Sequence, residues 1–250
     1  MQSEQPVVPG TGRILDYWYG GAHHTAADVG AAQAFESVYP NIGNVFRTLR
    51  AYQTWMVRYI YGQGINQFLV FGAGIPTQLH VHEVLPQARV VYTDIDPLCV
   101  TYGEEILETV PNTAYTFCDI TDLAGLDRTI TAPLIDFDKP LGLVSVGVSA
   151  FLTDEPLKAA LAALYHTVAD GSYFAIDFDS TGWTYVPDIL TIIAAAGEPL
   201  NLRTPNQIEP LLGNWQLAGH GIVPASVTRE VTPSDAKDEA VFMYGAVLRK

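Results

Sequence analysis

Short apolar runs alternate with longer amphipathic segments along most of the chain. The first run, QFLVFGAG, ends in glycines, and the segment PTQLHVHEVLP after it carries apolar residues at helical spacing. Runs that are apolar almost throughout are typical of strands buried on both faces of a parallel sheet. Five such runs are predicted to be strands, at 67–74, 88–94, 113–119, 140–148 and 171–179.

The segments between these runs predict helices that cover both faces of the sheet. Asp96 followed by Pro97 is a typical helix start, and Thr153 with Asp154 begins another helix that runs to Val168. Further helical segments are expected at 28–38, 43–61, 76–86, 121–130, 187–197 and 204–213. Strands that alternate with helices in this way predict an α/β, doubly wound, Rossmann-like fold.

The last part of the chain contains two further apolar runs, NWQLAGHGIVP and EAVFMYGAVLRK, joined by the polar segment TREVTPSDAKDE. Strands joined in this way pair antiparallel, so a hairpin is predicted at the end of the otherwise parallel sheet. Apolar residues make up 48% of the chain and are spread evenly along it. We therefore expect one domain over 1–250, with a helical N-terminal cap at 1–62 and the Rossmann-like core at 63–250.

The charge balance narrows the classes of partner. The chain has 13 basic and 27 acidic residues, a net charge of -14, which repels phosphate backbones and anionic lipid surfaces. We therefore expect a small-molecule substrate, no nucleic acid and no membrane, and a homodimer remains open. Two cysteines, Cys99 and Cys118, are too few for a disulfide framework, and the N-terminus lacks the features of a leader. These observations predict a cytoplasmic protein.

The ends of the first three strands carry the residues that predict a ligand. Ligands of doubly wound sheets bind at the carboxyl ends of the strands, where the strand order reverses. Gly72 and Gly74 allow the backbone to approach a ligand closely. Asp94 is placed to accept hydrogen bonds from ribose hydroxyls, and Asp119 from the exocyclic amine of adenine. This combination favours a nucleoside ligand.

The residues that the glycine loop lacks indicate which group the nucleoside carries. Ile75, Pro76 and Thr77 follow Gly74, so the third glycine of the dinucleotide pattern G-x-G-x-x-G is missing, as is the Gly-Lys-Ser/Thr of a Walker loop. A nicotinamide oxidoreductase is therefore disfavoured, and S-adenosylmethionine is favoured as the cofactor. Ordinary turn residues of an α/β sheet are the alternative interpretation.

Several segments resemble the bacterial S-adenosyl methyltransferase family, many of whose members lack an assigned substrate. RILDYWYGG (13–21) is similar to its N-terminal signature, an arginine followed by Tyr-Asp-Tyr-Leu-Leu-Gly-Gly, and GAGIPT (72–77) to Gly-x-Gly-Leu-Pro-Thr. VVYTDIDP, CDITD, FLTDE, GIVP and YGAVLRK also match, so the resemblance spans nearly the whole chain. It implies a class I methyltransferase sheet and S-adenosylmethionine-dependent methyl transfer to a small molecule, which we expect to belong to specialised metabolism.

The resemblance also implies that the N-terminal cap closes on the cofactor. Combined with the glycine loop and the two acids, it gives a set of residues expected to bind the cofactor: Arg13, Tyr17, Gly20, Gly72, Gly74, Thr77, Asp94, Ile95, Asp119, Ile120 and Ser149.

Two departures from the family pattern bear on the chemistry. Val70 stands where the family has an acid that organises the cofactor's amino end, and AHHT (22–25) replaces a Lys-Asp-Asn-Phe-like segment. An aliphatic side chain accepts no hydrogen bond, so that contact must come from elsewhere or be lost. An alternative function is therefore a methyltransferase-like protein that binds the cofactor and catalyses a cyclisation or rearrangement, or binds it without turnover.

Three residues are candidates for proton transfer. His23 and His24 lie in the cap, where histidine is the usual base at neutral pH, but adjacent histidines in a loop are also common on solvated surfaces. Asp177 follows the fifth strand at the sheet end that faces substrate, where an acid can act as a base or cap the next segment. His80 and His82 resemble a metal pair, but their spacing puts them on different faces of a helix, so no metal is expected.

Overall fold

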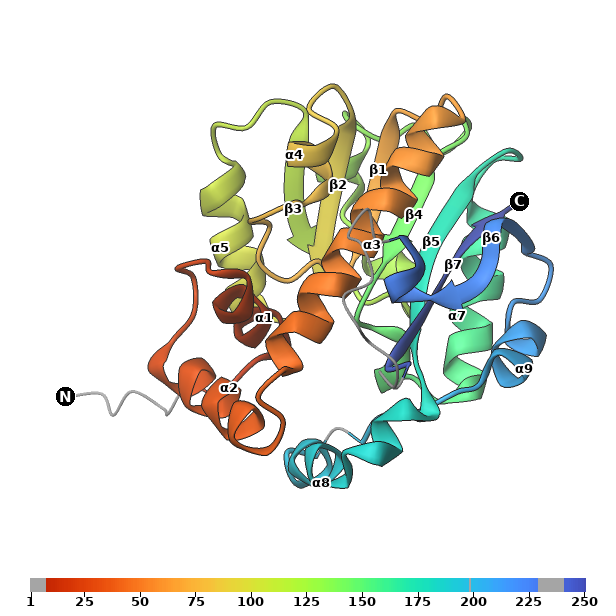
Figure 1. Ribbon diagram of the computed structural model, residues 1–250. Helices are drawn as coiled ribbons and strands as arrows, with labels where there is room; N and C mark the ends of the chain where they lie inside the picture. The colour runs from red at the N-terminus through yellow and green to blue at the C-terminus, as the bar shows by residue number, and fades with distance from the viewer. Residues whose placement is uncertain (1–7, 198, 229–240) are drawn as a thin grey trace.

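The computed structural model describes residues 8–197, 199–228 and 241–250. Its centre is a seven-stranded sheet with the order β3-β2-β1-β4-β5-β7-β6 (Figure 1). The strands are β1 (Gln67–Phe71), β2 (Arg89–Asp94), β3 (Thr113–Phe117), β4 (Gly142–Ser145), β5 (Tyr173–Asp179), β6 (Gln216–Pro224) and β7 (Met243–Arg249). β1 to β5 pair in parallel, and β7 pairs antiparallel with both β5 and β6. The doubly wound sheet and its terminal hairpin are confirmed, and the polar loop joining the hairpin lies almost wholly outside the described residues.

Five of the longer helices begin within two residues of the predicted starts, whereas α1 (Thr11–Tyr19) was not predicted. The helices of more than one turn are α1, α2 (Ala26–Val38), α3 (Ile42–Gly62), α5 (Pro97–Leu107), α7 (Asp154–Thr167) and α8 (Pro187–Ala195). Thr25 caps α2 with a reciprocal capping box through Asp28, and Asp96 caps α5 by accepting the Leu98 N–H. Helix α1 ends at Gly20, which has a left-handed φ of 80°. The N–H groups of Gly20 and Gly21 donate to the carbonyls of Tyr17 and Asp16 in the last turn.

Two hydrophobic cores lie on opposite faces of the sheet. Along β1, Phe68 and Val70 belong to one core, and Leu69 and Phe71 belong to the other. The first face is covered by α3, which crosses the sheet diagonally in Figure 1, and the second by α7. This alternation explains why the strands are apolar at every position, since both side-chain directions are buried.

The helix expected at 76–86 is the main correction to the predicted elements. Only α4 (Val81–Val84) is helical there, and the residues before it form an open loop. Gln78 and Leu79 have left-handed φ values of 52° and 62°, and the Leu79 N–H is held by the Glu83 carboxylate. Apolar spacing alone did not reveal this turn. The segments expected at 121–130 and 204–213 are likewise broken into single turns, α6 (Arg128–Thr131) and α9 (Pro205–Ile208) with short 3-10 turns beside them.

The N-terminal helices α1 and α2 lie beyond the carboxyl ends of the parallel strands, with α8 at the same end of the molecule (Figure 1). α2 contacts α8, and α1 contacts the glycine loop after β1. Helix α3 differs from them because it leaves this end and packs along the sheet itself. Within the described ranges, every helix is too short or too polar to cross a lipid bilayer.

Candidate functional site

The loop after β1 is shaped by two glycines. Gly72 and Gly74 have φ values of 59° and 62°, a left-handed conformation that side chains disfavour. A Cβ on Gly72 would lie 2.2 Å from the Cγ2 atom of Val148, and one on Gly74 would lie 3.2 Å from the Cα atom of Gly12. Helix α1 is therefore seated directly on the loop. Both glycines are thus needed for contacts within the protein, and the close approach of this loop to a ligand stays a prediction.

Asp94, the last residue of β2, holds this loop in place. One carboxylate oxygen accepts the Gly74 N–H at 2.8 Å, and the other accepts the Asp96 N–H at 2.9 Å. Burial raises the pKa of Asp94, and the two backbone N–H groups oppose that shift. Each carboxylate oxygen can accept a second hydrogen bond. Asp94 can therefore fix the loop and still accept hydroxyl groups of a sugar.

Apolar side chains are exposed beside Asp94 at the ends of β2 and β3. Ile95 is 60% exposed and Phe117 is 51% exposed, and Phe117 is the register partner of Asp94. Such an edge suits a flat purine ring. Asp119 is half-buried near it and accepts two hydrogen bonds from Thr121 through one oxygen, which leaves the other oxygen for an amine. The sequence did not single out Phe117, although an aromatic residue just before the acidic segment is a usable signal.

Arg13 ties the cap to the sheet. Its guanidinium pairs with Asp28 at 3.1 Å, contacts Asp96, and donates to the carbonyl of Val8 at 2.6 Å. Burial lowers the pKa of Arg13, but the two carboxylates outweigh it and the net shift is upward. Arg13 thus joins α1, α2 and the start of α5. Its donors are occupied by these partners, so its position supports a structural role in closing the cap.

Asp16 is the centre of a second polar cluster in the cap. Its carboxylate accepts from the Thr77 hydroxyl at 2.9 Å and the His23 N–H at 2.8 Å, and lies 3.0 Å from Nδ1 of His24. The ring of His24 stands edge-on to Tyr17, with 5.4 Å between their centroids. Asp16 thus connects the histidine segment to the glycine loop. The sequence contained this signal as the aspartate inside RILDYWYGG, but the aspartate was not recognised as a site residue.

Asp177 lies on β5 with an unused carboxylate oxygen. Oδ1 accepts the Gly147 N–H at 2.8 Å, whereas Oδ2 has no hydrogen-bond partner in the described part of the chain. The residue is 1% exposed. Burial, and after it the charge of Asp179, raise the pKa of Asp177 to about 8. The Ser149 hydroxyl donates to the Asp177 carbonyl at 2.6 Å, so Ser149 supports the strand end through the backbone.

Asp179, two residues further along β5, is satisfied by the protein. It accepts the Nε1–H of Trp183 at 2.7 Å, and Trp183 is itself buried against Phe242. Burial raises the pKa of Asp179 to about 6, and its bond to Trp183 opposes the shift. The structure therefore distinguishes the two acids. One carboxylate oxygen of Asp177 has no hydrogen-bond partner among the described residues, whereas Asp179 holds the indole of Trp183.

The three candidates for proton transfer do not form one cluster. The ring of His23 lies 5.7 Å from that of Tyr102 on α5, the helix that follows β2. β2 and β5 are separated by β1 and β4, so their ends are about 14 Å apart at the usual strand spacing. The histidines thus lie on the β2 side of the sheet and Asp177 on the β5 side. Across the described residues, nowhere do three His, Cys, Asp or Glu side chains gather to hold a metal ion.

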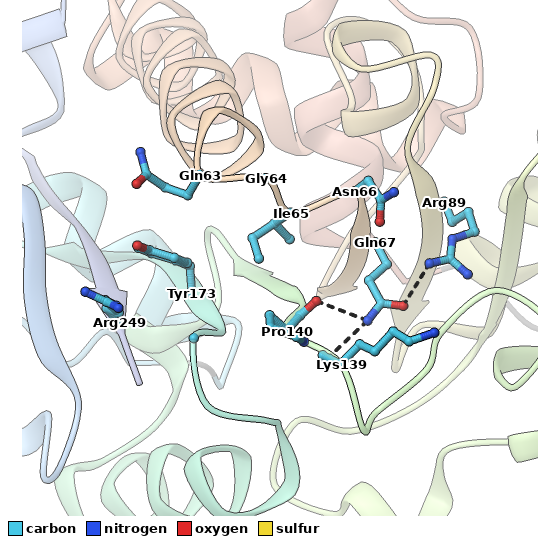
Figure 2. Close-up of a pocket in the computed structure, with 11 residues that line it drawn as sticks. Gln63, Gly64, Ile65, Asn66, Gln67, Arg89, Lys139, Pro140, Tyr173 and Arg249 are labelled. Atoms are coloured by element: carbon cyan, nitrogen blue, oxygen red, sulfur yellow. Dashed lines mark hydrogen bonds between the residues drawn. The ribbon is translucent and has the colours of Figure 1, made fainter.

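A cavity of about 430 Å³ lies at the opposite end of the strands (Figure 2). It is lined by Gln67, Arg89 and Lys139 at the N-terminal ends of β1 and β2 and before β4. Gln67 donates to the Asp136 and Pro140 carbonyls at 2.8 and 3.1 Å and accepts from Arg89 at 3.2 Å, while Lys139 pairs with Asp136 at 2.9 Å. Gln67, Arg89 and Lys139 thus already have protein partners in this cavity. The carboxyl ends of the strands are therefore the better candidate for a ligand site.

A family model described as S-adenosyl methyltransferase matches residues 2–250. The chain belongs to the S-adenosyl methyltransferase family. It is an S-adenosylmethionine-dependent methyltransferase of the class I fold, and S-adenosylmethionine is its cofactor, as the glycine loop and the resemblance predicted. The family assignment and the shared fold together confirm these predictions.

Solved structures agree with this assignment. The methyltransferase is 30% identical to a DUF574 family protein from Streptomyces avermitilis, with a TM-score of 0.83 and coverage of 97% of this chain and 98% of that one. It is 28% identical to a candidate methyltransferase from Thermobifida fusca, with a TM-score of 0.84 and coverage of 97% and 95%. Magnesium protoporphyrin IX methyltransferase from Synechocystis, solved with S-adenosylhomocysteine, shares the fold at 13% identity, a TM-score of 0.55 and coverage of 95% and 93%. A comparison with curated proteins found no match.

The residues of the methyltransferase fit this cofactor. Gly72 allows the loop to lie against the Val148 side chain, where a Cβ would collide, and Asp94 and Ile95 stand at the end of the neighbouring strand β2. Val70 is buried in the core under α3, so β1 supplies no acid for the cofactor's ammonium group. The amino-acid end of the cofactor must therefore be recognised by other residues.

Proposed function

We propose that the methyltransferase methylates an oxygen or nitrogen of a small molecule and that Asp177 accepts the proton released by that atom. S-adenosylmethionine supplies an electrophilic methyl group on a sulfonium. The observation that carries the proposal is the Oδ2 atom of Asp177, which is buried near the carboxyl end of β5 and has no hydrogen-bond partner among the described residues. A base is useful in methyl transfer where the acceptor must lose a proton.

The raised pKa of Asp177 suits this role. A carboxylate with a pKa of about 8 is a far stronger base than an ordinary aspartate. The Gly147 N–H fixes one oxygen, so the other is held in one orientation. A positive charge brought close to Asp177 would favour the carboxylate over the neutral acid. The carboxylate is then available as a proton acceptor when the site is filled.

The enclosure of the site supports a small acceptor. α1, α2 and α8 lie over the carboxyl ends of the strands (Figure 1). Arg13 links α1 to α2 and to the start of α5. The net charge of -14 disfavours nucleic acid as an acceptor. The valine at position 70 and the AHHT segment support an acceptor of specialised metabolism unlike those of closer family members. Two buried free thiols, Cys99 and Cys118, support a cytoplasmic location.

The test is transfer of a labelled methyl group. The full chain is incubated with methyl-deuterated cofactor and a panel of phenols, amines and carboxylic acids, and products are detected by mass spectrometry. We expect label in one product and a loss of about 100- to 10,000-fold in rate for Asp177→Asn, since that is the usual contribution of a general base. Below pH 8 the wild-type rate should rise with pH, because the carboxylate form of Asp177 becomes more abundant.

Asp179→Asn is the matched control. Its side-chain carbonyl can still accept the Trp183 N–H, so its rate should stay near that of the wild type. A product that is altered but carries no label would instead favour the non-methylating alternative. Equal losses for Asp177→Asn and Asp179→Asn would contradict the role assigned to Asp177.

A further inference from the structure

Arg50 is a buried cation that pairs with no carboxylate in the described part of the chain. It lies in the middle of α3 and is 8% exposed. Its Nε and Nη1 atoms are fully buried and donate to nothing. The other buried arginines differ, since Arg13 pairs with two carboxylates and Arg203 bonds to Asp154 and to three carbonyls. An uncompensated buried charge destabilises a fold, so its presence points to a ligand.

The surroundings of Arg50 place it at the cofactor end of the sheet. Its guanidinium carbon lies 4.7 Å from the centroid of the Tyr19 ring, at the end of α1. Burial, and after it the charge of Arg50, hold the pKa of His80 well below its usual value, and His80 comes three residues after the glycine loop. Burial raises the pKa of Tyr19, and the nearby charge of Asp177 raises it further. Arg50 thus lies among α1, the glycine loop and the acid on β5.

The donor geometry of Arg50 selects the kind of ligand. A guanidinium offers parallel N–H groups that match the two oxygens of a carboxylate. The ring of Tyr19 supplies cation–π attraction to the face of the group. The Tyr19 hydroxyl also interacts with Arg50, but it offers a single oxygen, and the Nε and Nη1 atoms still have no acceptor. The free N–H groups of Arg50 therefore suit a planar anion with two acceptor oxygens, such as a carboxylate.

We propose that Arg50 binds the carboxylate of the cofactor's methionine tail. In this chain Val70 cannot hold the ammonium of that tail, and the cap acids Asp16 and Asp28 already have protein partners. Recognition by charge then falls on the carboxylate of the tail and on Arg50, the buried cation near the loop that has no carboxylate partner among the described residues. The inference rests on the family's cofactor and not on the acceptor chemistry proposed above.

Two ligands that differ only in the tail test this assignment. S-adenosylhomocysteine carries the amino-acid tail, and 5′-methylthioadenosine has the same nucleoside and thioether without it. Isothermal titration of the full chain should show that Arg50→Met weakens S-adenosylhomocysteine by about 10- to 100-fold, the usual worth of hydrogen bonds to a charged group. The affinity for 5′-methylthioadenosine should stay within about twofold, because no carboxylate is lost.

Arg47→Gln is the matched control on the same helix. Arg47 lies one turn earlier and donates to the Trp18 carbonyl at 2.6 Å and to Asn44. Its loss should leave the ratio of the two affinities unchanged. Melting of the ligand-free proteins separates ligand binding from a structural role: Arg50→Met should melt at or above the wild-type temperature, because an unpartnered charge is removed.

Three results would overturn the assignment. One is an equal loss of affinity for both ligands, and another is wild-type affinity of Arg50→Met for S-adenosylhomocysteine. The third is unchanged cofactor affinity together with lost activity on a carboxylate acceptor, which would assign Arg50 to the acceptor instead. If Arg50→Met does not fold, Arg50→Lys replaces it and should bind S-adenosylhomocysteine with intermediate affinity. Wild-type binding of 5′-methylthioadenosine reports the nucleoside site independently, and Asp177→Asn should leave both affinities intact.

Discussion

At the scale of single residues, the site retains two side chains that oppose folding. Asp177 and Arg50 are buried, and neither has all of its polar atoms satisfied by the described protein. Residues of this kind are expected where function outweighs stability. The charge of each becomes useful only when a ligand supplies the missing partner.

The pH dependence of stability tests the environment of Asp177. Its pKa is about 8 in the folded protein against an ordinary value of 3.8, so between about pH 4 and 8 the folded state binds more protons than the unfolded state. Wild-type stability should therefore fall relative to Asp177→Asn as the pH rises through this window. The gap should approach about 6 kcal/mol above pH 8, since the shift is about four units and one pKa unit corresponds to about 1.4 kcal/mol.

Urea unfolding at pH 5, 7 and 9 measures this gap. Asp179→Asn should show a smaller gap that develops between about pH 4 and 6 and stays constant above it, because the pKa of Asp179 is raised only to about 6. A difference between wild type and Asp177→Asn that is constant over all three pH values would show that burial does not shift the pKa of Asp177.

The site residues that could be predicted from the sequence are those that belong to a local sequence pattern. Gly72, Gly74 and Asp94 were predicted because a tight turn and an acid at the next strand end have a fixed spacing along the chain. Arg50 was not, because an arginine within an amphipathic helix usually faces solvent. Its burial depends on which side of α3 faces the sheet and on the position of α1. Asp16 was missed for the same reason, since its partners are distant in sequence.

At the scale of elements, strands and long helices were predicted well because their signals are local. Helices α5 and α7 begin at Pro97 and Asp154, where capping residues indicated a start. The helix expected at 76–86 failed because Gln78 and Leu79 adopt left-handed conformations that apolar spacing does not reveal. Such strain in non-glycine residues is typical of functional loops, and this loop follows the glycine turn.

The close packing of α1 on the glycine loop predicts the effect of a larger residue at position 12. A Cβ on Gly12 would lie 2.8 Å from the Gly74 Cα atom and 2.9 Å from the Cys99 sulfur. Gly12→Ala should therefore displace α1, lower the thermal midpoint and weaken S-adenosylhomocysteine by about tenfold or more, because the backbone of the loop cannot yield.

Gly30→Ala in α2 is the matched control. An added Cβ there meets open space, so the change should raise stability by about 0.5 to 1 kcal/mol and leave the affinity unchanged. Melting curves and titrations of both variants are the measurements. Equal effects of the two substitutions would contradict close packing of α1 on the loop.

At the scale of the whole molecule, the two ends of the sheet have different roles. The amino ends of the strands surround a cavity in which Gln67, Arg89 and Lys139 already bond to the protein, as Figure 2 shows for Gln67. The carboxyl ends gather the glycine loop, Asp94, Arg50 and Asp177 beneath α1 and α2. Asp177 and Arg50 thus carry unsatisfied polar atoms at the end of the sheet where we expect the cofactor.

A crystal structure of the full chain with S-adenosylhomocysteine tests the account most directly. We predict the nucleoside beside Asp94 and Ile95, the tail carboxylate in contact with the Arg50 guanidinium, and the sulfur on the side that faces Asp177. A ligand bound away from the glycine loop, or a tail carboxylate that meets another residue while Arg50 stays unpartnered, would contradict it.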